Sequence, residues 1–245
     1  MIGVSGIHIE QGGGATNGLL TGLLSYWKLD EASGTIVDSH GSVDSATESV
    51  TYGATGIINN ALDFESSSSN YVGFGTSDFN FERTDPFSYS YWFNPESDGV
   101  TECHIGKAEA SGVFRGWSVF RLTSNVLRVT YRSTTSNAIR KDSSAILASS
   151  GIRHIVVTYD GSSDASGINI YIDGTLSSMT TQQDNLSTTM QTSGINFSIG
   201  SRNNTGNYTD GIIDEVAIWD RELDSTDVSA LYNSGSGLAY GNFTS

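Results

Sequence analysis

Two adjacent carboxylates, Asp214 and Glu215, lie near the start of a stretch that is otherwise apolar. Residues 211–219 read GIIDEVAIW, and their period of two predicts a strand with even-numbered side chains on one face and odd-numbered side chains on the other. Because both faces are mostly apolar, we expect the strand to be covered on both sides, as in a sandwich. An unpaired carboxylate is costly to bury, so these two acids require partners.

The chain offers no arrangement of residues that is typical of a hydrolase. Glycoside hydrolysis needs two carboxylates that face a sugar across a cleft, whereas Asp214 and Glu215 are predicted to point to opposite faces of their strand. No histidine lies near a Gly-x-Ser-x-Gly signature, and no zinc-ligand spacing or phosphate-binding glycine loop is present. We therefore predict that the protein is not an enzyme.

An aromatic side chain beside polar turns can form a platform for a sugar. Most aromatic residues of this chain fall on predicted core strands, where packing is the simpler interpretation. Tyr208 is different, because it lies in the polar loop sequence SRNNTGNYTDG. We take Tyr208 as the candidate ligand-binding residue, with an ordinary loop aromatic as the alternative.

The net charge of −15 limits the partners that the chain can have. Phosphate backbones and anionic membrane surfaces require basic patches, so we expect no nucleic-acid partner. No stretch reaches the roughly 18 apolar residues of a membrane span, so we expect no membrane insertion. The charge is compatible with cation binding and with neutral sugar ligands.

The single cysteine, Cys103, excludes an intrachain disulfide. The N-terminal sequence has no basic region and no apolar run of the kind that directs export. Both features favour folding in a reducing cytosol.

Residues 1–22 differ from the rest of the chain and are predicted to form an N-terminal arm. Apolar residues alternate at its start, and the glycines at 12–14 then provide a flexible joint. The arm is either a disordered terminus or an anchor that docks on another protein by adding a strand. Self-association of the chain into a homo-oligomer is also possible.

Residues 23–245 are predicted to form one all-β domain. Short apolar stretches recur at the 8 to 12 residue spacing of antiparallel sandwiches, and the Asp173–Gly174 pair is typical of a tight hairpin turn. One short helix is expected after Asp224 or Ser225. The pattern therefore predicts a two-sheet antiparallel jelly-roll sandwich with one short C-terminal helix. The main expected strands are 23–29, 61–64, 71–74, 87–93, 102–107, 116–122, 126–132, 153–159, 168–172, 195–200 and 211–219.

Five blocks of sequence carry a family resemblance. They are YWKLDEASGTIVDSHG (26–41), GIINNALDF (56–64), FSYSYWFNP (87–95), HIVVTYDG with YIDG (154–161 and 171–174), and GIIDEVAIWDRELDSTDVSALYNSG (211–235). In that order they resemble the laminin-G-like, concanavalin-A-like jelly-roll domains, and more narrowly those of bacterial and phage surface proteins. The blocks are specific for the fold and not for a ligand, because this fold hosts many functions.

The resemblance implies that the first strand runs antiparallel to the last, which would bring Asp30 close to Asp214. Like carboxylates share a site only with a cation or a proton between them. Calcium, which prefers oxygen ligands, is the natural cation, and related domains often hold a structural calcium in this region. We therefore expect Ca²⁺ at Asp30 and Asp214, with Asp38 as a third candidate. The alternative is that these acids face solvent or accept backbone N–H groups at strand ends.

The resemblance leaves three functions open. The first is a bacteriophage virion surface protein, namely a capsid decoration, head fibre or tail component, which is anchored to other virion proteins by its arm and binds host glycans. The second is a free or secreted bacterial carbohydrate-binding module. The third is a divergent glycoside hydrolase. We expect the first, with the virion surface as its location and the bacterial exterior as the alternative.

Overall fold

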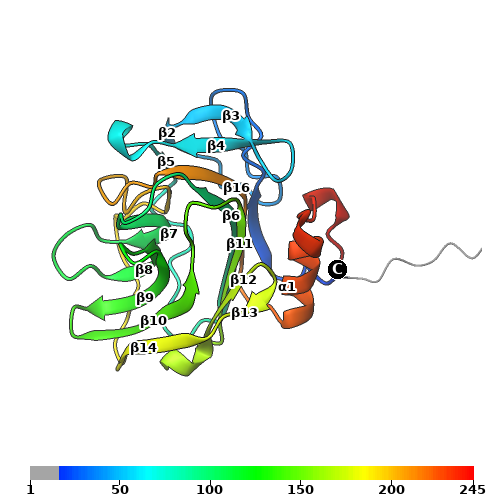
Figure 1. Cartoon of the computed structure of the whole chain (residues 1–245). Helices are drawn as coiled ribbons and strands as arrows, with labels where there is room; N and C mark the ends of the chain where they lie inside the picture. The colour runs from blue at the N-terminus through cyan, green and yellow to red at the C-terminus, as the bar shows by residue number, and fades with distance from the viewer. Residues whose placement is uncertain (1–16) are drawn as a thin grey trace, which may run out of the picture.

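The computed structural model describes residues 17–245 and consists of two antiparallel sheets packed face to face (Figure 1). The strand order is β13-β12-β11-β6-β16-β4-β3 in sheet A, with β1 also paired to β16, and β14-β10-β9-β8-β7-β15-β5-β2 in sheet B. One helix, α1 (Ser225–Tyr232), lies against the outer face of sheet A. The predicted jelly-roll sandwich with a short C-terminal helix is confirmed.

The strands are short, and most fall where the apolar pattern predicts them. Sheet A contains β1 (Leu23–Trp27), β3 (Thr51–Thr55), β4 (Asn60–Phe64), β6 (Phe87–Pro95), β11 (Arg153–Tyr159), β12 (Ile168–Ile172), β13 (Thr175–Leu176) and β16 (Gly211–Trp219). Sheet B contains β2 (Thr47–Ser49), β5 (Tyr71–Gly73), β7 (Glu102–Ala108), β8 (Gly116–Arg121), β9 (Val126–Thr134), β10 (Asn137–Ile146), β14 (Met179–Asp184) and β15 (Ser198–Ile199). The sequence analysis did not expect β10 and β14, which carry mainly polar and charged side chains.

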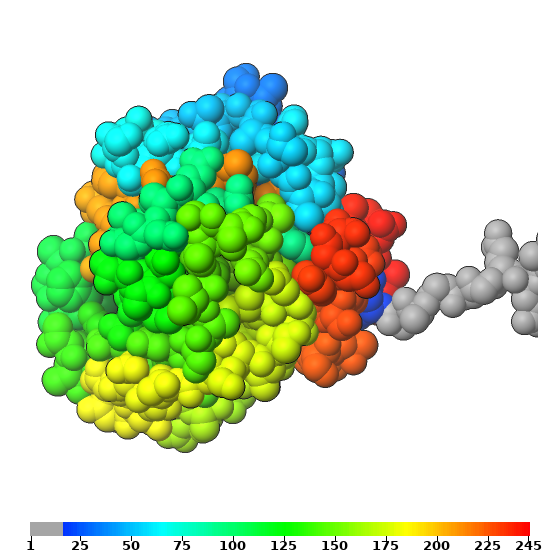
Figure 2. Space-filling view, in the orientation of Figure 1, coloured from blue at the N-terminus to red at the C-terminus, as the bar shows by residue number. Residues whose placement is uncertain are grey.

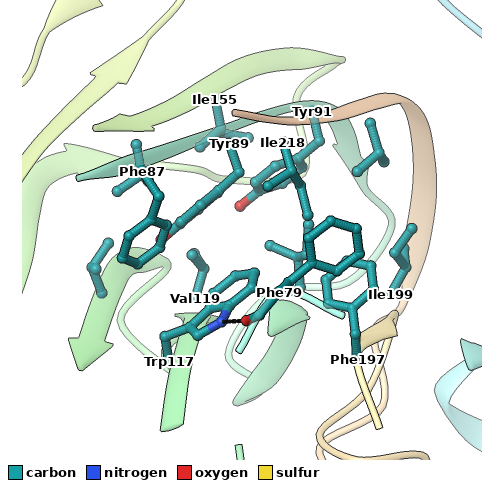
Figure 3. Close-up of a cluster of buried hydrophobic side chains, with 14 of the residues drawn as sticks. Phe79, Phe87, Tyr89, Tyr91, Trp117, Val119, Ile155, Phe197, Ile199 and Ile218 are labelled. Atoms are coloured by element: carbon teal, nitrogen blue, oxygen red, sulfur yellow. Dashed lines mark hydrogen bonds between the residues drawn. The ribbon is translucent and has the colours of Figure 1, made fainter. Parts of the chain in front are cut away.

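The main core lies between the two sheets and is rich in aromatic residues (Figure 3). Phe87, Tyr89 and Tyr91 of β6 all point into it, as the alternation of that strand predicts. Trp117 of β8 stacks on Tyr89 with ring centroids 5.2 Å apart, and its indole Nε1 donates to the Phe79 carbonyl at 2.8 Å. That hydrogen bond satisfies the one polar group of an otherwise apolar ring in the core.

A second apolar cluster covers the outer face of sheet A. Trp219 of β16 belongs to this cluster together with Leu223 and with Val228 and Leu231 of α1. Phe243 of the C-terminal segment is also part of it. The Asp224 carboxylate caps α1 by accepting from the backbone N–H groups of its second and third residues, which confirms the predicted start. The C-terminal segment forms a ridge on this side of the body (red in Figure 2).

Residues 17–22, which the sequence analysis assigned to the arm, pack on the domain. Leu19 is buried in the second cluster, and its carbonyl accepts from the indole of Trp219 at 2.8 Å. Leu20 N–H donates to the carbonyl of Thr244. The remainder of the predicted arm, residues 1–16, lies outside the described residues.

The prediction that even-numbered residues of β16 share one face is wrong. The pairing of β16 with β6 shifts register between Asp214 and Ala217, and Glu215 adopts a left-handed conformation with φ 50°. This bulge inserts an extra residue, so that Ile213 points into the main core together with Val216 and Ile218. The period-two rule fails because it assumes an uninterrupted ladder.

Among residues 17–245, no helix has the length and apolar character needed to cross a membrane.

Candidate functional site

The outer face of sheet B carries a surface cavity of about 340 Å³. Strands β8 and β9 form its floor, because the residues that alternate with their core-facing positions must point outward. Ser118 of β8 lies opposite Thr130 of β9, and Thr130 in turn lies opposite Arg140 of β10. The cavity is also lined by Arg128, Arg132 and Arg202, so we call it the arginine cavity.

Arg128 is the one arginine of the cavity whose charge is neutralised directly. Its Nε and Nη2 donate to the two carboxylate oxygens of Asp142, each at 2.7 Å. Asp142 lies directly opposite Arg128 on β10, so the antiparallel register creates this two-pronged ion pair.

The other three arginines, Arg132, Arg140 and Arg202, form no ion pair within residues 17–245. The Nε atom of each is buried and has no hydrogen-bond partner there. Burial lowers the pKa of Arg132 to about 10, and the neighbouring guanidinium groups add to the decrease. All three remain protonated at neutral pH, so the cavity holds a net positive charge.

Two phenylalanines support the guanidinium groups. The Arg202 guanidinium lies 4.5 Å from the ring centroid of Phe120 and 5.1 Å from that of Phe114, and that of Arg132 lies 5.9 Å from Phe114. Aromatic faces attract cations at these distances. The rings therefore position the cations and give the cavity an apolar wall.

Tyr208 lies in the loop that reaches the cavity, but Arg202 and Asn207 are the residues of this loop that line it. Tyr208 is half-buried, and its hydroxyl contacts the carbonyl of Asn204 at 3.5 Å. A ligand-binding role for Tyr208 stays a prediction, and the arginines of the cavity were not among the predicted site residues. Arg128 and Arg132 could have been found from the alternation in RVTYR (128–132). In a strongly acidic chain, this pattern places two cations on one face of a strand.

The predicted metal ligands Asp30 and Asp214 reach the same turn. Strands β1 and β16 pair antiparallel as expected, and Asp214 accepts from the N–H groups of Ile57 at 2.8 Å and Ile58 at 3.2 Å. Asp30 accepts from the N–H of Asn60 at 3.0 Å. Burial raises the pKa of Asp214 to about 7, and the negative charge of Asp30 contributes.

Asp214 and Glu215 each have an unpaired carboxylate oxygen. Asp214 is fully buried, and its Oδ1 has no hydrogen-bond partner among the described residues. Glu215 is 5% exposed, and its Oε2 is likewise unpaired. Burial raises the pKa of Glu215 to about 8. Either a proton or a cation would remove the cost of burying these charges.

Asp38, the third predicted ligand, organises a different turn. Its Oδ1 accepts from the N–H groups of Tyr26, His40 and Gly41 at 2.9–3.0 Å, and its Oδ2 accepts from Val43 at 3.1 Å. These bonds hold residues 38–43 against β1.

One further acidic group lies at the ends of β4 and β6. Carboxylate oxygens of Asp63, Glu65 and Glu96 lie within 4.8 Å of one another. Burial raises the pKa of Asp63 and of Glu96, and neighbouring acids, among them Asp210, raise both further. These residues were not among the predicted ligands; Asp63 and Glu65 are close in sequence, but Glu96 joins them only through the fold.

The fold is shared with several proteins of known structure, among them two toxin binding domains and a sialidase. The chain is similar to the binding domain of Paraclostridial Mosquitocidal Protein 1, with 17% identity, a TM-score of 0.67, and coverage of 89% of this chain and 53% of that one. For the botulinum neurotoxin serotype G binding domain, the identity is 19% and the TM-score is 0.63, with coverage of 86% of this chain and 50% of that one. For the Trypanosoma rangeli sialidase in complex with sialic acid, the identity is 15% and the TM-score is 0.59, with coverage of 89% of this chain and 34% of that one. The chain thus spans about half or less of the length of these proteins.

A comparison with curated proteins finds no match. The family model of the laminin-G type, described as the concanavalin A-like lectin/glucanases superfamily, matches residues 66–229. This range includes all the strands that form the floor of the arginine cavity, and it ends inside α1. The chain therefore belongs to the concanavalin A-like lectin/glucanases superfamily.

Proposed function

We propose that this jelly-roll domain is a non-enzymatic adhesion domain that binds cell-surface glycans in the arginine cavity. The observation that carries the proposal is the cavity itself. Its floor offers the hydroxyl groups of Ser118 and Thr130, its walls offer aromatic and cationic side chains, and its volume of about 340 Å³ suits a small ligand. None of the described residues lines it with a carboxylate, whereas glycoside hydrolysis needs two.

Binding to a glycan array is the direct test. The wild-type chain should bind at least one class of bacterial or host glycan, and Ser118→Trp should abolish that binding because the indole would fill the floor of the cavity. Thr175→Trp, on an exposed edge strand of sheet A, is the matched control. Binding that survives Ser118→Trp in a folded protein would place the glycan site elsewhere. Release of sugar from any bound glycan would contradict the non-enzymatic assignment.

The bacteriophage virion surface is the setting that we propose, with a free or secreted bacterial lectin as the alternative. Cys103 is a buried thiol, and burial raises its pKa to about 12, so it is unreactive and suited to a chain that folds in a reducing cytosol. Mass spectrometry of purified phage particles that encode the chain distinguishes the two settings. Recovery of the chain in particles supports the virion, whereas recovery only in bacterial culture medium supports the alternative.

The N-terminal arm is the part that we propose to dock on other virion proteins or to form a homo-oligomer. Because Leu19 is buried in the domain, the truncated variant must begin at Asn17. Light scattering should show assembly of the full chain and a monomer for the truncated chain. Two monomers would rule out self-assembly, and a pull-down with capsid or tail proteins would then test docking.

Structural calcium at Asp30 and Asp214 is a separate proposal. The unpaired Oδ1 of buried Asp214 and the nearby Asp30 carboxylate supply oxygen ligands. Asp38 is a weaker candidate, because its carboxylate already accepts four backbone N–H groups. Calcium should raise the melting temperature of the wild type relative to chelator, and Asp214→Asn should lose this response. An unchanged melting temperature in the wild type would remove the calcium site.

A further inference from the structure

We infer that the ligand of the arginine cavity is an anionic glycan, whose carboxylate or sulfate group binds between Arg132, Arg140 and Arg202. The inference rests on the proposed function for the saccharide part of the ligand. The anionic part stands on the charges and the hydrogen-bond donors of the cavity.

The charge of the cavity is opposite to that of the chain. The chain has 27 acidic and 12 basic residues, yet among residues 17–245 four arginines and no acidic residue line this cavity. The ion pair with Asp142 neutralises Arg128, whereas the other three guanidinium groups form no ion pair with any residue that the structure describes. Like charges that are half-buried together repel one another, so this cluster lowers the stability of the free protein. An oxyanion in the cavity would reverse that repulsion.

The hydrogen-bond donors of the cavity are also unpaired. Arg132, Arg140 and Arg202 each have a buried Nε–H without an acceptor among residues 17–245. Buried donors normally find partners, and guanidinium donors form their strongest hydrogen bonds with oxyanions. A carboxylate or sulfate oxygen is therefore the chemical group that completes these donors.

The position of the arginines favours recognition of a whole sugar acid over a free ion. Phe114 and Phe120 both contact the Arg202 guanidinium, and both rings line the cavity, where they add apolar surface against which a sugar face can pack. The hydroxyls of Ser118 and Thr130 lie on the floor next to Arg140 in the cross-strand register. A saccharide can thus place its acid group on the arginines and its hydroxyls on the floor.

Calorimetry with the full chain and matched pairs of glycans tests the inference. The pairs are polygalacturonate and its methyl ester, sialyllactose and lactose, and dextran sulfate and dextran. The acidic member of at least one pair should bind about tenfold or more tightly than its neutral partner, because a charge-assisted hydrogen bond is lost with the acid group. The carboxylate pairs and the sulfate pair distinguish the two sources of the oxyanion.

Arginine variants locate the effect. Arg132→Gln and Arg140→Gln should each weaken binding of the acidic glycan about tenfold. Arg153→Gln, which removes an arginine of sheet A paired with Asp173, is the matched control and should bind as the wild type does. The affinity should also fall as sodium chloride rises, and less steeply in Arg132→Gln.

The outcomes separate this inference from the proposed function. Equal binding of acidic and neutral glycans, with loss in Ser118→Trp, would overturn the anionic ligand and leave the adhesion function intact. Binding of inorganic sulfate that depends on Arg132, without binding of any glycan, would support the oxyanion site and overturn the glycan function. Tighter binding of a single-stranded oligonucleotide than of every acidic glycan would overturn the inference. Unaltered acidic-glycan binding in both arginine variants would also overturn it.

Discussion

The two outer faces of the sandwich meet the same requirement in different ways. On sheet A, the outward side chains include the apolar residues Leu23, Tyr26 and Trp219, and α1 with the C-terminal segment packs on them. On sheet B, the outward side chains of β8, β9 and β10 include hydroxyls, phenylalanines and arginines, and they line an open cavity. A sheet face must either be covered or be made compatible with water.

The difference matches the roles that we propose, namely stability for the outer face of sheet A and binding for that of sheet B. Covering Trp219 and Val228 removes apolar area from water, which is the main favourable contribution to folding. The arginine cavity does the reverse, because it gathers like charges and leaves donors unpaired. Such an arrangement lowers stability locally and is typical of a site that awaits a ligand.

The largest expected effect is on the covered face. Trp219→Ala should reduce the free energy of unfolding by about 3–5 kcal/mol, because it leaves a void beneath α1 and breaks the bond to the Leu19 carbonyl. Urea denaturation measures the change. Leu176→Ala is the control, since Leu176 is 50% exposed and should lose less than about 0.5 kcal/mol. A loss below about 1 kcal/mol for Trp219→Ala would show that the cover contributes little.

A smaller effect is expected at the bulge of β16. Folding raises the pKa of Glu215 from 4.5 to about 8, so the folded state holds a proton that the unfolded state releases between these values. The contribution of this protonated carboxyl to the free energy of unfolding is fully present below pH 4.5. It is lost as the pH rises towards 8, the pKa in the folded state.

Glu215→Gln removes this titration. At pH 8 it should raise the free energy of unfolding on the order of 2 kcal/mol relative to the wild type, and near pH 4.5 the two proteins should be alike. Denaturation at several pH values measures the difference. Asp220→Asn, at an exposed position that follows β16, should leave the pH profile unchanged. If Glu215→Gln has the same pH profile as the wild type, the carboxylate is not protonated by burial.

The smallest effect on stability is expected in the arginine cavity. Arg140→Gln removes one of the mutually repelling cations, so its melting temperature should be no lower than that of the wild type while its affinity for acidic glycans falls. Differential scanning calorimetry measures the first quantity. A decrease as large as that of Trp219→Ala would contradict the comparison and make the arginines structural.

The local features of the fold could be predicted from the sequence. The alternation of Phe87, Tyr89 and Tyr91 identified the core face of β6, the Asp173–Gly174 pair forms the turn between β12 and β13, and Asp224 caps α1. Each of these depends on neighbours within a few residues, where backbone sterics and side-chain spacing are sufficient.

The arginine cavity could not be predicted in the same way. Arg128 and Arg132 are visible as an alternating pair, but Arg140 joins them through the register of β10 on β9, and Arg202 arrives from a distant loop. Strand register and loop paths depend on long-range pairing, about which the local pattern carries no information. The same limit explains the wrong prediction for the faces of β16.

The sequence by itself therefore determined the all-β class, the main strands, the position of the helix, and the antiparallel neighbours β1 and β16 through the family resemblance. Only the tertiary structure decided that the outer face of sheet A is covered while that of sheet B carries a cluster of cations. The physical reason is that burial and electrostatic interaction act between residues that are close in space, whatever their separation along the chain.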